Sequence, residues 1–109
     1  MITKEQFDKE IQNTVKQLIN LYKPEKVILF GSLAEGKIDQ GTDIDLFIIK
    51  NEVPESGVDR IRQLETIIKY NLATDFIIFK PAEVEQRLKL GDPFIINILK
   101  EGKILYNAA

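Results

Sequence analysis

Three aspartates interrupt apolar stretches of the sequence, and their spacing suggests a metal site. Asp43 and Asp45 open the run DIDLFII over residues 43–49, and Asp75 stands near the start of the run TDFIIF over residues 74–79. Residues two apart on a strand project from the same face, so Asp43 and Asp45 would bring four carboxylate oxygens together. Such crowding is unfavourable without a cation, whereas a divalent ion turns it into attraction. We therefore predict that the three aspartates converge on a metal ion.

Each aspartate also has a purely structural interpretation, as a turn residue, a cap or a solvated residue on an edge strand. The neighbouring Gly31-Ser32 favours the chemical interpretation, because this pair directly follows the apolar run KVILF over residues 26–30. Glycine lets a phosphate approach the backbone, and a serine hydroxyl with nearby amides can donate hydrogen bonds to phosphate oxygens. Taken alone, Gly-Ser would indicate only a turn.

The absence of two residue types narrows the chemistry further. The chain contains no cysteine and no histidine, which excludes disulfides, thiolate nucleophiles, thiolate zinc sites and Ser-His catalysis. Aspartate, glutamate, lysine and tyrosine remain as candidates for proton transfer. Metal ligands must then be mainly oxygen donors, which suit Mg²⁺ or Mn²⁺. The lack of cysteine also fits a reducing cytoplasm.

Length and charge limit the partners. A chain of 109 residues fits one domain. A formal net charge of −2 gives no electrostatic attraction to a long nucleic acid, which argues against a DNA polymerase. No apolar stretch approaches the roughly 20 residues that cross a bilayer, and the N-terminus lacks a signal-peptide core. We expect a cytoplasmic protein without membrane association.

The positions of the reactive residues depend on alternating helices and strands. Apolar residues at spacings of three or four, capping residues and prolines predict helices over residues 3–22, 58–68, 81–90 and 92–101. Thr3 with Gln6 forms a capping box, and Ser56 with Asp59 occupies capping positions. Short apolar runs predict strands over residues 26–30, 43–49, 74–79 and 103–106. This alternation indicates the α/β class.

Two features of the pattern leave alternatives open. Ile95, Ile96, Ile98 and Leu99 exceed one helical face, which is consistent with a protein interface or with a buried core helix. The three tyrosines, Tyr22, Tyr70 and Tyr106, are either sites of self-modification or packing residues within apolar patterns.

The run GSLAEGKIDQGTDIDLFII over residues 31–49 resembles the signature of the minimal nucleotidyltransferase (MNT) family of the polymerase-beta-like superfamily. The resemblance implies an α/β fold, with a small mixed β-sheet flanked by helices, and one nucleotidyltransferase domain over residues 1–109. It further implies that Gly31 and Ser32 bind the phosphates of ATP or another nucleoside triphosphate. Thr42 replaces a frequent serine and keeps its hydroxyl.

The same resemblance assigns roles to the carboxylates. Asp43 and Asp45 would bind two Mg²⁺ ions, with Mn²⁺ as an alternative, and Asp75 would complete the catalytic triad. The sequence departs from the family pattern at Leu33 and at Glu35, where arginine is common. Glu35 would repel a triphosphate unless it points away or pairs with Lys37.

The function implied is transfer of a nucleoside monophosphate, AMP from ATP in the first instance, to a hydroxyl of a protein or a small molecule. Small members resemble the antitoxin of HEPN–MNT toxin–antitoxin modules, so a helical HEPN-type protein is the expected partner, with a homo-oligomer as a further expectation. The alternative is a catalytically silent binding module that neutralises its partner by contact. An aminoglycoside-type enzyme is disfavoured, because such enzymes use an additional domain or partner to hold the acceptor.

Overall fold

A computed structural model describes residues 1–108, and its centre is a mixed sheet of four strands in the order β3-β2-β1-β4. Strand β1 runs antiparallel to both β2 and β4, whereas β2 and β3 are parallel. The bounds are β1 (Lys26–Phe30), β2 (Ile44–Ile49), β3 (Thr74–Phe79) and β4 (Lys103–Asn107). All four strands lie where the sequence predicts them, although β2 begins one residue after Asp43.

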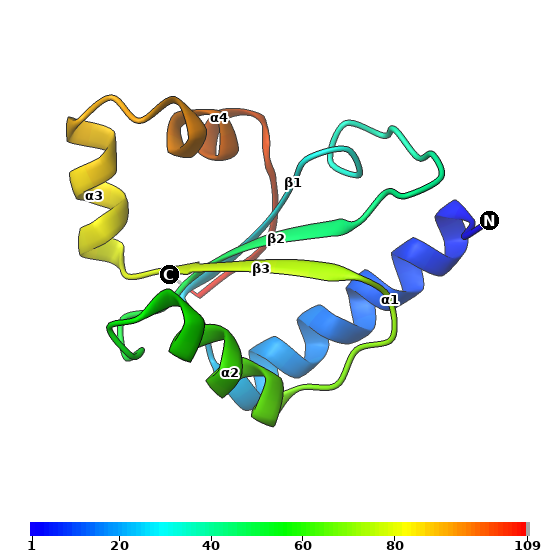
Figure 1. Cartoon of the computed structure of the whole chain (residues 1–109), viewed down its shortest axis with the longest axis horizontal. Helices are drawn as coiled ribbons and strands as arrows, with labels where there is room; N and C mark the ends of the chain where they lie inside the picture. The colour runs from blue at the N-terminus through cyan, green and yellow to red at the C-terminus, as the bar shows by residue number, and fades with distance from the viewer. Residues whose placement is uncertain (109) are drawn as a thin grey trace.

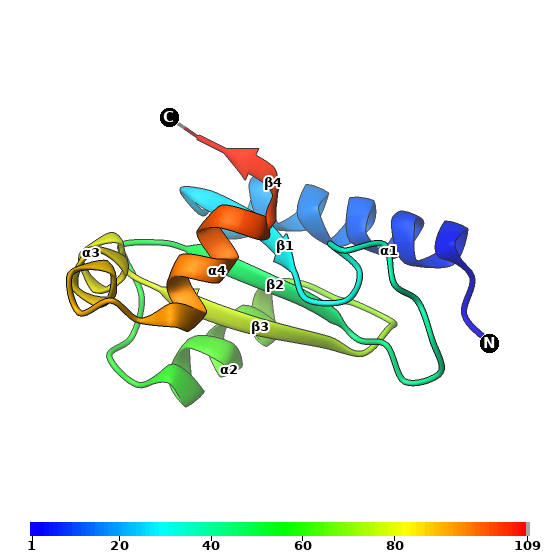
Figure 2. The same ribbon diagram turned by 90° about the horizontal axis from the view of Figure 1, so that it is seen from above.

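Helices cover both faces of this sheet. The helical elements are α1 (Lys4–Gln17), the π-helical turn η1 (Leu18–Tyr22), α2 (Gly57–Ile67), α3 (Pro81–Lys89) and α4 (Pro93–Glu101). Figures 1 and 2 show α1 and α2 on one side of the sheet and α3 and α4 on the other. No helix within residues 1–108 is long and apolar enough to cross a membrane.

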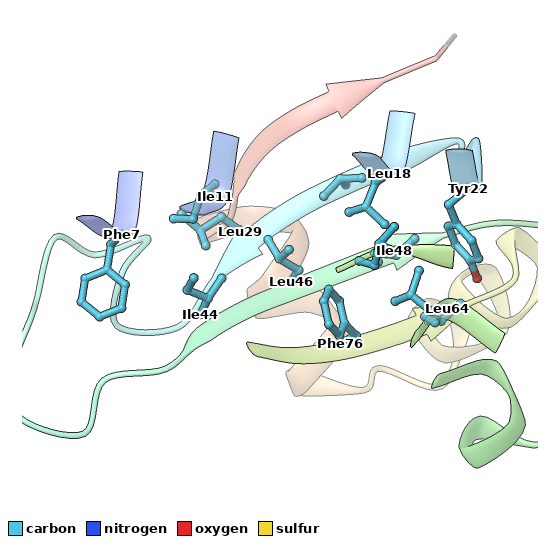
Figure 3. Close-up of a cluster of buried hydrophobic side chains, with 13 residues drawn as sticks. Phe7, Ile11, Leu18, Tyr22, Leu29, Ile44, Leu46, Ile48, Leu64 and Phe76 are labelled. Atoms are coloured by element: carbon cyan, nitrogen blue, oxygen red, sulfur yellow. The ribbon is translucent and has the colours of Figure 1, made fainter. Parts of the chain in front are cut away.

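Alternate residues of β2 serve the two faces. Ile44, Leu46 and Ile48 join the larger core cluster with α1, η1 and α2, and Figure 3 shows them among its side chains. Phe47 and Ile49 belong to the second cluster, beneath α3 and α4. A strand covered on both faces is almost continuously apolar, which explains why the run DIDLFII loses its polar residues after the second aspartate.

Local signals set the helix starts. The Thr3 hydroxyl accepts a hydrogen bond from the Gln6 amide at 3.2 Å, and the Gln6 side chain accepts one from the Thr3 amide at 2.8 Å, so the predicted capping box is confirmed. Ser56 likewise accepts from the Asp59 amide. The first helix reaches Tyr22 as predicted, but its last turn is π-helical. It ends because Lys23 adopts a left-handed conformation, with φ 57°, and donates its amide to the Leu18 carbonyl.

Helix α4 has more apolar residues than one helical face can hold, and they lie partly in the core and partly at the surface. Ile95 and Ile98 are fully buried in the second cluster, as a buried core helix would have them. Leu99 is half-buried, whereas Phe94 and Ile96 are 48% and 41% exposed. Packing against the sheet therefore accounts for only part of the apolar surface of this helix.

Candidate active site

Sheet register brings two of the three aspartates together. Asp45 on β2 is paired with Asp75 on the parallel strand β3. On its other side, Asp45 is paired with Phe30 on the antiparallel strand β1. Neighbouring strands lie about 4.8 Å apart, so Asp45 has Asp75 on one side and the chain entering Gly31 on the other. Asp43 lies just before β2 and is exposed, as is Asp75, whereas Asp45 is half-buried.

The carboxylates interact electrostatically at Asp45. The pKa of Asp45 is raised from 3.8 to about 6, first by burial, then by the negative charge of Asp75 and a side-chain hydrogen bond with Asp75, and last by the charge of Asp43. A nearby cation would reverse this charge crowding. The two neighbours predicted for Asp45 are thus the two whose charges act on it.

These residues fit a hard cation by donor type. Their ligand atoms are carboxylate oxygens, which Mg²⁺ prefers, and the charges that shift the pKa of Asp45, those of Asp75 and Asp43, are both negative. However, no group of three acidic side chains within residues 1–108 has the arrangement of a complete metal site. The pairing of Asp45 with Asp75 is observed, and convergence of all three on one ion stays a prediction.

Gly31 is required by its position beside Asp45. Its φ is +74°, and a Cβ built there would collide with the Asp45 carboxylate. The turn that follows is held by the Ser32 carbonyl, which accepts from the amides of Glu35 at 3.1 Å and Lys37 at 2.9 Å. The exposed Ser32 side chain therefore lies on a fixed turn at the end of β1, next to the acidic pair.

Thr42 has a partner of its own. Its hydroxyl accepts from the Asp39 amide at 2.8 Å and donates to the Asp39 carboxylate at 3.0 Å. These bonds close the turn before Asp43, which gives Thr42 a structural role. A role in nucleotide binding stays a prediction.

Glu35 is exposed and has Lys37 beside it, with 4.0 Å between Nζ and Oε1. The pairing anticipated from the sequence is thus present. An ion pair of this length between two exposed side chains contributes little stability, and it leaves much of the Glu35 charge at the surface.

Two hollows adjoin at the site. The acidic hollow, about 480 Å³, contains Asp45 and Asp75. The glycine-turn hollow, about 640 Å³, lies between the turn after Gly31 and α4. Phe30 and Phe94 line both hollows, and their rings meet edge to face at 5.8 Å.

Sequence reasoning missed the side chains that α4 contributes. Phe94, Asn97 and Glu101 line the glycine-turn hollow. The sequence offered one signal for these side chains: Phe94 is an apolar residue outside the helix face that Ile95 and Ile98 bury. The acidic hollow also contains Tyr70, whose hydroxyl donates to Glu65 at 2.6 Å, whereas Tyr22 is buried in the core.

Comparison with known proteins adds independent information. A family profile described as "Polymerase beta, Nucleotidyltransferase" matches residues 9–109. Two proteins of Methanocaldococcus jannaschii, both named "putative protein adenylyltransferase", are similar to the chain. One is 33% identical over 86 residues, which cover 74% of this chain and 57% of the relative's length. The second is 29% identical over 101 residues, which cover 87% of this chain and 97% of the relative.

A crystal structure of a "putative nucleotidyltransferase" from Sulfolobus solfataricus has a similar fold, with a TM-score of 0.58 at 18% identity. The match covers 97% of this chain and 90% of that one. The expected α/β fold, a mixed sheet flanked by helices, is thereby confirmed.

Proposed function

The chain belongs to the polymerase beta nucleotidyltransferase family, and from this membership we propose that it transfers AMP from ATP to a hydroxyl group. The observation that carries the proposal is the pairing of Asp45 with Asp75 beside Gly31. The names of the two Methanocaldococcus jannaschii relatives support AMP as the group transferred and a protein as the acceptor.

In the proposed reaction, the acceptor hydroxyl gives its proton to Asp75 as its oxygen bonds to the α-phosphorus of ATP. The bond from that phosphorus to the oxygen bridging to the β-phosphate breaks, and pyrophosphate leaves. Asp75 is exposed, so a hydroxyl on a macromolecule can reach it. Gly31 and Ser32 would hold the phosphate oxygens, because the glycine allows close approach and the serine hydroxyl donates.

Asp43, Asp45 and Asp75 are the residues that would hold Mg²⁺, or Mn²⁺ in its place. A bound divalent ion neutralises charge on the attacking and leaving oxygens of phosphoryl transfer. The charge crowding that raises the pKa of Asp45 supports this assignment, since a cation would relieve it.

The experiment is a transfer assay in host extract with ATP labelled at either the α- or the γ-phosphate. We expect α-label but no γ-label on a macromolecule, and loss of transfer in Asp45→Asn. Asp8→Asn is the matched control, because it makes the same change on the exposed side of α1. If α-label is transferred equally by Asp45→Asn, the assigned site is wrong.

A second function, a catalytically silent module that neutralises a partner by contact, is favoured by Glu35. This acidic side chain lines the glycine-turn hollow at a position where the family resemblance leads one to expect arginine. Neutralisation that survives Asp45→Asn, together with no α-transfer from any nucleoside triphosphate, would support the silent module over the enzyme.

We propose a helical HEPN-type protein as partner, with self-association as the alternative. Exposed apolar side chains on and between α3 and α4 support a protein contact there: Leu88, Leu90 and Ile96. Co-expression and size-exclusion chromatography with such a protein would give a stable complex of higher mass, whereas self-association would appear with the chain alone. The proposed site of action is the cytoplasm, which the absence of cysteine fits.

A further inference from the structure

The glycine-turn hollow is large enough for a nucleoside and lies beside the proposed phosphate-binding turn. Its volume of about 640 Å³ is within the range of small-molecule pockets. It meets the acidic hollow at Phe30 and Phe94, which line both. One ligand could therefore occupy the glycine-turn hollow while reacting beside Asp45.

The walls of this hollow suit a base better than phosphates. Its charged lining residues are Glu35 and Glu101, and no lysine or arginine contributes to it within the described chain. Carboxylates would repel a triphosphate, whereas the exposed Phe94 ring and the buried Ile98 offer apolar surface. Bases are commonly bound by stacking on aromatic side chains.

Two polar side chains of α4 form one edge of the hollow. Asn97 and Glu101 are four residues apart, so they lie on the same side of the helix. Both are exposed, and neither makes a side-chain hydrogen bond or ion pair to any residue within 1–108. They are therefore available to a ligand.

We propose that this hollow is the base pocket of the donor nucleotide, and that Asn97 and Glu101 select adenine. The inference rests on the proposed nucleotidyl transfer. An asparagine amide can both donate to a ring nitrogen of adenine and accept from its exocyclic amine. The Glu101 carboxylate accepts from the same amine, but it would face the O6 acceptor of guanine and repel it. The exocyclic amine of adenine would thus gain hydrogen bonds, whereas the O6 oxygen of guanine would face the Glu101 carboxylate with no proton between them.

The acceptor is then left with the acidic hollow. Asp75, which takes the acceptor proton in the proposed reaction, lines that hollow and does not line the glycine-turn hollow. The Phe30–Phe94 pair would separate base from acceptor. This division assigns a separate role to each of the two hollows that meet at Phe30 and Phe94.

The test measures binding as well as transfer. Isothermal titration calorimetry would compare ATP, GTP, CTP and UTP, each with Mg²⁺, on the wild type and on Asn97→Ala, Glu101→Gln and Phe94→Ala. Lys100→Ala is the matched control, because it alters an exposed residue of α4 that does not line the hollow. Thermal melts would confirm that each variant is folded.

We expect the wild type to prefer ATP over GTP, and Asn97→Ala to weaken ATP binding roughly tenfold while GTP changes little. Phe94→Ala would weaken all four nucleotides, since stacking does not depend on the base. An unchanged ATP-to-GTP ratio in both Asn97→Ala and Glu101→Gln, with α-transfer still present, overturns the base pocket but leaves the proposed function standing. If the wild type neither binds nor transfers any nucleotide, the proposed function fails and this inference fails with it.

Discussion

At the scale of single residues, Asp45 links stability, pH and metal binding. In the metal-free protein its pKa is about 6, against 3.8 for an ordinary aspartate. The folded state therefore holds the proton more tightly than the unfolded chain, and stability falls as pH rises from about 4 to about 6. Because Asp45 is partly solvated, we discount this loss to roughly 1 kcal/mol.

Asp45→Asn cannot ionise, so we expect it to be more stable than the wild type at neutral pH, by about 1 kcal/mol, and to lose that dependence on pH. Urea denaturation from acidic to neutral pH measures both. Adding Mg²⁺ should raise the melting temperature of the wild type but not of the variant, because only a ligand that binds the folded site stabilises it. Equal stabilisation of both proteins would remove Asp45 from the metal site.

Gly31 offers a test of close approach, with a matched control in the same turn. Gly31 and Gly36 have nearly the same positive φ, +74° and +75°, but only at Gly31 would a Cβ meet the Asp45 carboxylate; at Gly36 nothing lies within 4 Å. Both alanine variants pay about 1–2 kcal/mol for the left-handed conformation. Gly31→Ala should lose about 1 kcal/mol more, because the Asp45 carboxylate must move away from the new Cβ, and ATP binding should weaken with it.

Urea denaturation and calorimetry on the two variants decide the point. If Gly31→Ala and Gly36→Ala lose the same stability and bind ATP alike, the contact between Gly31 and Asp45 has no energetic consequence.

At the scale of elements, α1 fixes the loop that leads into β3. The buried Glu10 carboxylate accepts from the backbone amides of Asn71 at 2.5 Å and Leu72 at 2.7 Å. The Gln17 side chain bonds the amide and carbonyl of Lys69. These bonds hold the approach to Thr74 and Asp75, so a residue of the first helix positions the third aspartate.

We expect Glu10→Gln to destabilise the fold by about 1–3 kcal/mol, because one charged carboxylate oxygen accepts both backbone N–H groups and a neutral amide oxygen in its place would accept them more weakly. Glu5→Gln, an exposed change in the first turn of the same helix, is the control and should cost less than about 1 kcal/mol, the value of an acidic side chain at a helix N-terminus. Denaturation curves measure both, and hydrogen exchange should accelerate at residues 71 and 72 in Glu10→Gln alone. Protection that is unchanged there would show that Glu10 does not hold the loop.

Elements were largely predictable because their signals are local. The Thr3 capping box, the apolar run before Gly31 and the prolines at positions 81 and 93 each act within a few residues, and the helices and strands follow them. The hydrogen bonds from Asn71 and Leu72 to Glu10 were not predictable, because their partners are separated by 61 and 62 positions in the sequence. Residue type and spacing predicted that Asp45 and Asp75 converge, but their exact pairing depends on the register of β2 with β3, which only the folded sheet defines.

At the scale of the whole molecule, the two hollows exist only after folding. The turn after β1 and helix α4 are about sixty residues apart in sequence, yet both line the glycine-turn hollow. Gly31 and Ser32 were recognisable because their motif is contiguous. Asn97 and Glu101 carry no such motif, and their significance appears only when α4 packs across β1.

Charge is also a property of the whole molecule, and it predicts which polymers the protein avoids. The net charge is −2, and the charged residues that line the two hollows are all acidic. Affinity for a nucleic acid depends on lysines and arginines that neutralise phosphates and release counterions. We therefore expect no binding of duplex or single-stranded DNA or RNA at physiological salt, measured by fluorescence anisotropy with labelled oligonucleotides, while ATP with Mg²⁺ still binds. Salt-sensitive binding of an oligonucleotide would reveal a basic surface and direct the search for the acceptor towards RNA or DNA ends.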